Sequence, residues 1–194
     1  MSTDADADPT GDDDHEKTTI TTVCLGGCAG CHMEFLNLDH GLVDLLEDVD
    51  IRASHMIVDG KDVPEADIGI AEGFVTNEEN VEVARELREN CDTVVAWGDC
   101  AALRGIMSLR NHDDRDETLE DIYVDRGDAE SEVPDGDGDA IPKLLQDGQP
   151  LDAFVDVDVY IPGCPPDAEI MRYGIEALAN GERPEIVDDK LQYD

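Results

Sequence analysis

The chain has 194 residues, 40 % of them hydrophobic, which is enough for one domain with a full core. Its 50 acidic and 13 basic residues give a formal net charge of −37, which disfavours nucleic acid and anionic membranes as partners, because phosphate binding requires clustered lysine and arginine. No apolar run reaches membrane-spanning length, so the sequence predicts no membrane insertion. The N-terminus lacks the pattern of a signal peptide and has no twin-arginine pair, so we expect a cytoplasmic protein.

The predicted elements alternate along the chain. Residues 1–17 are rich in aspartate and are expected to form a disordered acidic leader, ahead of one folded domain at residues 18–194. The expected strands cover residues 18–23, 51–58, 67–71, 93–97 and 155–161. The expected helices cover residues 33–47, 76–90 (opened by a capping box of Thr76 and Glu79) and 168–179 (capped by Asp167 and ended by Asn180-Gly181). The acidic stretch 111–140 is expected to be a surface loop with a short helix near residues 119–124.

The acidic residues are spread through the whole chain, which a charged tail alone does not explain. At ordinary ionic strength such a net charge should push the fold apart. At molar salt the screening length falls to about 3 Å and the repulsion is muted. We interpret the composition as adaptation to a salty cytoplasm, as in a halophile; the alternative is an ordinary acidic protein with an acidic tail.

Strands alternating with helices predict an α/β fold, a doubly wound parallel sheet with helices on both faces. Ligands bind such sheets outside the carboxyl ends of the strands. Cys28 and Cys31 follow the first expected strand, Glu72 the third, Cys100 the fourth and Cys164 the fifth. These residues are therefore expected to meet at one edge of the sheet.

The cysteine pattern favours a metal site over a disulfide, because the chain reads as cytoplasmic. The pair Cys28-x-x-Cys31 alone fits a thioredoxin-like dithiol or half of a zinc site. A dithiol needs no further cysteines, and a zinc ribbon requires a second such pair, which the sequence lacks. One pair with the single residues Cys100 and Cys164 fits a 4Fe–4S cubane held from three loops. Structural zinc in a non-redox binding domain stays an alternative.

Two cysteines are surplus to this set. Cys91 precedes the fourth expected strand and is expected to face the core as a small apolar group. Cys24, four residues before Cys28, is the only plausible substitute ligand.

The loop around Cys164 reads Pro-Gly-Cys-Pro-Pro over residues 162–166. Its prolines stiffen the chain, its glycine permits close approach, and the helix after Asp167 directs positive partial charge back toward the loop. His32 could bond a cluster sulfur or contact a partner, whereas Glu72 could be a supporting, interface or merely solvated side chain. The residues expected to support the cluster are Glu72, Gly73, His32, Gly163 and Pro165.

Four ordered motifs carry a family resemblance: Cys-Ala-Gly-Cys-His-Met-Glu-Phe-Leu, Ala-Glu-Gly-Phe-Val, Gly-Asp-Cys-Ala-Ala and Ile-Pro-Gly-Cys-Pro-Pro-Asp. From about residue 18 to the end, the chain resembles the small subunit of NiFe hydrogenases, most of all the short cytoplasmic kind of NAD-reducing hydrogenases. The resemblance implies a flavodoxin-like fold and a proximal 4Fe–4S cluster on Cys28, Cys31, Cys100 and Cys164. It also implies a large subunit that carries nickel and iron, a flavin or iron–sulfur partner subunit, and a relay role for this chain, which has no nickel site of its own.

A second branch of the family is the cluster-bearing small subunit of NADH:quinone oxidoreductase, which this chain resembles at the Pro-Gly-Cys-Pro-Pro loop. That subunit typically has two adjacent cysteines where this chain has Cys28-x-x-Cys31, so the separated pair favours the hydrogenase side. Arg104-Gly105 departs from the Gly-Gly of many hydrogenase small subunits. A nickel-free, quinone- or ferredoxin-linked subunit stays the alternative. A flavodoxin-like sheet could also hold FMN, but the cysteines take the usual phosphate loop after the first strand, so FMN is not supported.

Overall fold

The computed structural model describes residues 17–57, 62–126, 132–134, 137–138 and 141–186. The expected acidic leader therefore lies outside the described residues, except for Lys17. Within the described part of the chain, no helix is long and apolar enough to cross a membrane.

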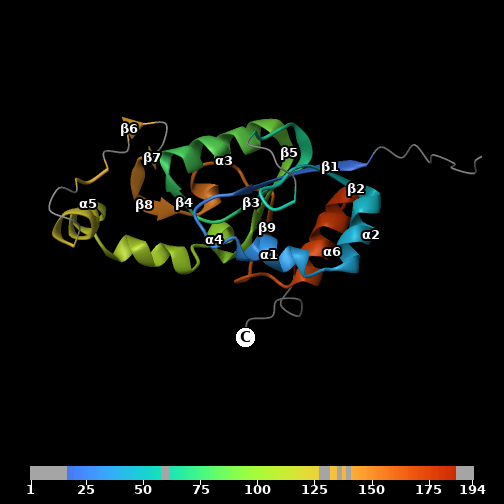
Figure 1. Ribbon diagram of the computed structural model, residues 1–194. Coiled ribbons are helices and arrows are strands. Elements are labelled where there is room, and N and C mark those ends of the chain that lie inside the picture. Colours follow the sequence, from blue (N-terminus) through green and yellow to red (C-terminus); the bar gives the residue numbers. More distant parts are fainter. Residues whose placement is uncertain (1–16, 58–61, 127–131, 135–136, 139–140, 187–194) are drawn as a thin grey trace, which may run out of the picture.

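Five parallel strands form the central sheet, in the spatial order β2-β1-β3-β5-β9 (Figure 1). The strands are β1 (Thr18–Cys24), β2 (Val49–Ala53), β3 (Ala66–Glu72), β5 (Cys91–Trp97) and β9 (Val159–Ile161). Numbered along the chain, these strands follow the order 2-1-3-4-5, which is the flavodoxin-like doubly wound topology. The expected α/β fold class is confirmed.

Helices cover both faces of the sheet, and each face has its own apolar core (Figure 1). One face carries α1 (Gly30–Leu36), α2 (His40–Asp48) and α6 (Ala168–Ala179), and the other carries α3 (Glu78–Asn90) and α4 (Gly98–Ala102). Side chains alternate along a strand, so Val95 and Trp97 of β5 join the first core while Val94 and Ala96 join the second. Burial on both faces explains the almost continuous apolar runs of β3 and β5.

The strand register sets the level of the carboxyl edge. Cys24 lies opposite Glu72, Glu72 opposite Trp97, and Trp97 opposite Ile161. Cys100 and Cys164 each come three residues after one of these edge residues. The loops that follow β1, β5 and β9 therefore leave the sheet side by side.

The single helix expected at residues 33–47 is wrong, because the chain forms α1 and α2 with a break at residues 37–39. Asp39 has a φ of 50°, and Asn37 caps the end of α1. Short polar side chains such as these compete with helical hydrogen bonding. The apolar spacing continues across the break, since Leu38 packs in the same core as Phe35 and Leu45, so periodicity could not reveal it.

The second and fifth strands are shorter than expected. β2 ends at Ala53, and residue 58 of the expected range lies outside the described residues. β9 begins only at Val159, because the preceding aspartate folds back: Asp158 Oδ2 accepts the N–H of Val94 at 2.8 Å. The side chain thus occupies a donor of β5 that a longer β9 would have bonded.

The expected capping box is also wrong by one residue. Asn77 is the N-cap of α3, and its Oδ1 accepts from the backbone N–H of Asn80 at 2.7 Å. Thr76 belongs instead to β4 (Val75–Asn77), where its N–H and hydroxyl both donate to Asn80 Oδ1. Asparagine is as good an N-cap as threonine, so the sequence alone did not separate the two.

The region expected to be a loop with a short helix has more structure than predicted. The expected short helix exists, but it begins at α5 (Arg115–Glu120), with Asp114 as its N-cap, and continues as a π turn at Asp121–Asp125. Two-stranded pairings were not foreseen: β4 with β8 (Leu144–Gln149), and β6 (Asp137–Gly138) with β7 (Ile141–Pro142). The remaining elements are 3-10 helices at Ile106–His112 and Leu151–Ala153.

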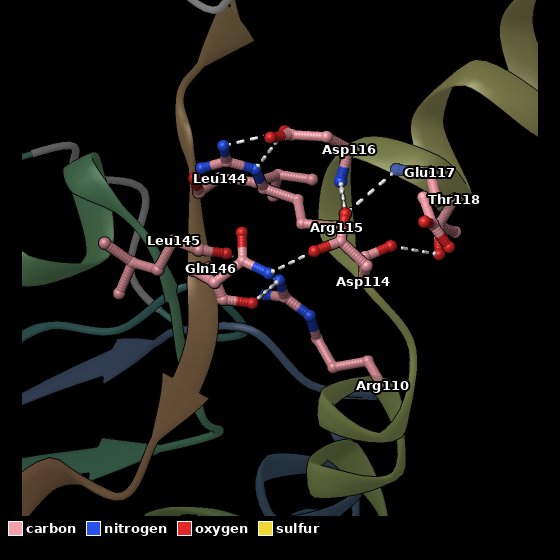
Figure 2. A network of polar contacts seen from close by, with 9 residues as sticks. All are labelled: Arg110, Asp114, Arg115, Asp116, Glu117, Thr118, Leu144, Leu145 and Gln146. Atoms are coloured by element: carbon pink, nitrogen blue, oxygen red, sulfur yellow. Dashed lines mark hydrogen bonds and ion pairs between the residues drawn. The ribbon is translucent and has the colours of Figure 1, made fainter.

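Two arginines fasten this region to the backbone of β8 (Figure 2). Arg110 donates to the carbonyls of Leu145 (2.6 Å) and Gln146 (3.2 Å), and also to that of Thr76 in β4. Arg115 donates to the carbonyl of Leu144 at 2.9 Å. Charged donors thus satisfy consecutive carbonyls along a two-stranded ribbon that would be marginal by itself.

We expect Arg110→Ala to lower the free energy of unfolding by about 2 kcal/mol, because it leaves three carbonyls without their charged donor. Urea unfolding followed by circular dichroism measures the change. Arg126→Ala is the matched control: its side chain is 74 % exposed and forms a direct surface ion pair with Asp121 at 2.7 Å, and such exposed pairs contribute little, so its loss should have little effect. Equal effects of the two substitutions would contradict the fastening role of Arg110.

Candidate iron–sulfur site at the carboxyl edge of the sheet

The loop after β1 presents Cys28 and Cys31 around a tight turn. Ala29 has a positive φ of 60° in this turn. At Gly30, a Cβ would lie 3.1 Å from Cys28 Sγ, so the missing side chain leaves room for that sulfur. Cys28 is exposed and Cys31 is half-buried at the start of α1, so the pair reaches from the surface into the protein.

The same loop is fixed to the loop after β3, which carries the expected supporting residue Gly73. Leu25 N–H donates to Glu72 O at 2.9 Å, and Gly26 exchanges two backbone hydrogen bonds with Phe74. Gly73 has a φ of 92°, and a Cβ there would lie 3.0 Å from Gly26 O. Gly73 therefore serves the site by close backbone approach.

Glycines also make room for the sulfurs of Cys31 and Cys100. A Cβ on Gly98 would lie 2.3 Å from Cys31 Sγ, and a Cβ on Gly105 would lie 2.8 Å from Cys100 Sγ. Both glycines have positive φ values, 79° and 55°. Of the unusual Arg104-Gly105 pair, the glycine therefore stands against the cysteine, whereas Arg104 is exposed.

The loop after β9 presents Cys164 at the surface, in front of α6. Gly163 has a φ of 141°, and a Cβ there would meet Pro166 Cα at 2.5 Å, so the residue must be glycine. Pro165 follows Cys164 through a cis peptide bond. Asp167 caps α6 as expected, with its carboxylate accepting from Glu169 N–H at 2.9 Å.

The structure brings the four expected cysteines together. Burial raises the pKa of the Cys31 thiol most; Glu72 raises it further, and so do the neighbouring sulfurs of Cys100 and Cys28. Burial likewise raises the pKa of Cys100, with further contributions from Cys164 and Cys28. Each thiolate that formed here would repel the negative charge of its neighbours, so the thiols stay protonated unless positive charge lies among them. Bound iron would supply that positive charge.

The spacing of these donors does not suit one metal ion. Among the described residues, no three His, Cys, Asp or Glu side chains lie close enough to hold a single ion. In a cubane each thiolate binds a different iron, so four sulfurs can stand further apart than around zinc. The four cysteines are the donor set that a 4Fe–4S cluster would use, and the metal analysis proposed below separates the cluster from zinc.

Behind the cysteines lies a buried polar network centred on Glu72, which is 2 % exposed and therefore not a solvated strand-end residue. Its carboxylate accepts from the Cys24 thiol (3.1 Å) and from the backbone N–H of His32 (3.1 Å). His32 Nδ1 lies 2.9 Å from Glu72 Oε1, close enough for an ion pair but without the alignment of a hydrogen bond, and Nε2 lies 2.8 Å from Thr22 Oγ1. The His32 ring thus faces this network.

The charges in this network oppose the effect of burial. Burial alone would raise the pKa of Glu72, but the contacts with His32 and Cys24 outweigh it and hold that pKa below its usual value. Burial, with the bond to Glu72, raises the pKa of the Cys24 thiol to about 12. Cys24 is therefore a protonated donor to Glu72 in this arrangement.

We expect Glu72→Ala to destabilise the fold by about 1–3 kcal/mol, because it leaves the buried N–H of His32 without an acceptor. Urea unfolding measures the change. Glu65→Ala is the control: Glu65 precedes the same strand β3 at its other end and is exposed, so its loss should be nearly neutral. A neutral Glu72→Ala would contradict the structural importance of the network.

Cys91 lies apart from the other cysteines, as expected. Its side chain is 4 % exposed in the second core, and its Sγ fills the space that a Cβ on Gly69 would occupy. It is the first residue of β5, whereas the site lies beyond the last, about 20 Å along a seven-residue strand.

Sequence reasoning missed two residues of the site. Gly98 and Asp99 stand between β5 and Cys100; Gly98 leaves room for Cys31 Sγ, and Asp99 Oδ1 accepts from Gly163 N–H at 2.7 Å. The available signal was the Gly-Asp-Cys motif directly at the end of a buried strand, where a positive φ and a close backbone approach are common.

Together, the fold and this edge define a class of protein: flavodoxin-like α/β subunits that gather cysteines at the carboxyl end of a parallel sheet. Within this class, the chain belongs to the family of the 20 kDa subunit of NADH ubiquinone oxidoreductase, whose family model matches residues 28–178.

Known relatives are hydrogenase subunits. One subunit of the F420-non-reducing hydrogenase of Methanothermobacter thermautotrophicus is 37 % identical over 181 residues, covering 91 % of this chain and 58 % of that protein. The delta subunit of the NAD-reducing hydrogenase HoxS of Cupriavidus necator is 34 % identical over 184 residues, covering 92 % of this chain and 86 % of that subunit. The chain thus spans less than two thirds of the archaeal relative and most of the bacterial one.

A solved structure of an NAD+-reducing NiFe hydrogenase contains a chain that is 37 % identical to this one. It superposes with a TM-score of 0.85 and covers 92 % of this chain and 99 % of its own. The fold and the resemblance to hydrogenase small subunits expected from the sequence are therefore confirmed.

Proposed function

We propose that this chain is the electron-transfer small subunit of a NiFe hydrogenase. It holds one 4Fe–4S cluster through Cys28, Cys31, Cys100 and Cys164. Its partners are a large subunit that carries nickel and iron, and a flavin or iron–sulfur subunit. The observation that carries the proposal is the convergence of four cysteines from three separate loops on one edge of the sheet, with glycines where side chains would displace the sulfurs.

When bound, a 4Fe–4S cluster supplies a one-electron relay. The chain's own residues hold and shield the site. Cys28 and Cys164 approach from the surface, where a partner subunit can dock, and Cys31 approaches from the interior. Glu72 fixes the start of α1 beside Cys31 through the N–H of His32. Such hydrogen bonds around a cluster tune its potential.

A nickel-free NADH- or ferredoxin:quinone oxidoreductase subunit is the second candidate. The observation in its favour is the family model itself, which describes a subunit of NADH ubiquinone oxidoreductase. Both candidates share the cluster and differ in the partner.

The first experiment is elemental analysis for iron, nickel and zinc on the native complex, purified without air through a tag on this chain. Iron together with nickel supports the hydrogenase subunit. Iron without nickel supports the quinone- or ferredoxin-linked subunit. Zinc with little iron would show that the cluster assignment is wrong.

The acidic composition supports a further part of the proposal, a cytoplasm with molar salt. Because the net charge is −37, we expect the melting temperature of the chain to rise steeply as potassium chloride increases toward molar concentrations. A melting temperature that is highest at low salt would favour an ordinary acidic protein instead.

A further inference from the structure

Asp99 joins the two loops that carry the single cysteines. Its backbone N–H donates to Gly163 O at 2.8 Å, and its Oδ1 accepts from Gly163 N–H at 2.7 Å. Both distances are those of good hydrogen bonds. Asp99 directly precedes Cys100, and Gly163 directly precedes Cys164. The two hydrogen bonds between Asp99 and Gly163 therefore join the two loops directly before Cys100 and Cys164.

The loop of Cys164 depends strongly on this pair. Three of the five residues at 162–166 are prolines without an N–H, so only Gly163 and Cys164 can donate from the backbone. Gly163 uses its donor on Asp99. The φ of 141° and the close approach of Pro166 require a glycine at this position, so residue 163 has no side chain that could make another contact.

We infer that Asp99 is a positioning residue, whose carboxylate fixes the Cys164 loop against the Cys100 loop and so sets the geometry in which the cluster is held. This inference rests on the proposed function, because it assumes that both cysteines are ligands. The acceptor oxygen rather than the negative charge carries the role, since the partner is a neutral N–H.

The chain offers a matched control just before β9, on the opposite side of that strand from Cys164. Asp158 N–H donates to Val94 O at 2.9 Å, and Asp158 Oδ2 accepts from Val94 N–H at 2.8 Å. Asp158 thus forms the same reciprocal pair between the β5 and β9 segments, but at the end of β9 opposite Cys164. Its removal weakens the fold, because the carboxylate also pairs with Arg88, without moving either cysteine loop.

The test compares the full 194-residue chain with its variants Asp99→Ala, Asp99→Asn and Asp158→Ala, each loaded with iron and sulfide without air. Three quantities are measured: the rate of iron release to a chelator, the electron paramagnetic resonance spectrum of the reduced cluster, and the melting temperature. We expect Asp99→Ala to release iron about tenfold faster, with an altered spectrum, as the loss of one hydrogen bond to the Cys164 loop predicts. Asp99→Asn keeps the acceptor oxygen and should match the wild type in its rate of iron release and in its spectrum.

Asp158→Ala should lower the melting temperature while it keeps the wild-type release rate and spectrum. The inference is overturned if Asp99→Ala behaves as the wild type, if Asp99→Asn is as impaired as Asp99→Ala, or if Asp158→Ala releases iron as fast. If Asp99→Ala does not fold, Asp99→Glu replaces it, because one extra methylene displaces the carboxylate and should also hasten release. A wild-type chain that takes up no iron would instead refute the proposed function, and the inference with it.

Discussion

Replacing Cys164 by serine should abolish the spectroscopic signal of the cluster and reduce bound iron to background. A serine hydroxyl is a poor substitute for a thiolate on iron, and the exposed loop of Cys164 has no second sulfur to offer. Cys28→Ser should have the same effect. Iron analysis and electron paramagnetic resonance of the reduced protein, purified without air, measure the loss.

Cys91→Ser is the matched control for these variants. It also removes one thiol, but from the second apolar core at the far end of β5. We expect the cluster signal to survive and only the stability to fall, because a hydroxyl replaces a buried apolar group. Loss of the cluster in Cys91→Ser, with retention in Cys164→Ser, would refute the proposed ligand set.

The sequence predicted the sheet well because burial on both faces leaves a local signal. The apolar runs of β3 and β5 and the capped helix after Asp167 are read directly from neighbouring residues. The break at residues 37–39 left no such signal, because Leu38 keeps the apolar spacing through it. The pairing of β4 with β8 was also hidden, because it joins residues about 70 positions apart and depends on Arg110 and Arg115.

The placement of the four cysteines at one edge could be predicted, because they follow strands whose ends had to share that edge. The residues that shape the site could not, since their roles depend on contacts between loops. Asp99 meets Gly163 across 64 positions, and Glu72 meets the N–H of His32 across 40. Nothing in the local sequence of either acid distinguishes it from the many solvated carboxylates of this chain.

Gly98→Ala should impair the site as severely as the loss of a ligand, although it changes no donor. The new Cβ would stand 2.3 Å from Cys31 Sγ, inside any normal contact, so the sulfur or β5 must move. The φ of 79° adds about 1–2 kcal/mol of backbone strain in an L-residue. We expect loss of most of the bound iron, measured by iron analysis of the full chain loaded without air, together with a lower melting temperature.

Gly181→Ala separates the two effects in Gly98→Ala. Gly181 has a similar φ of 72°, but a Cβ there meets nothing within 4 Å. This variant should therefore show the backbone strain alone: a modest fall in melting temperature with the iron content unchanged. If Gly98→Ala retained its iron as Gly181→Ala does, Cys31 would have to be free to move, and its sulfur could not be held where the structure places it.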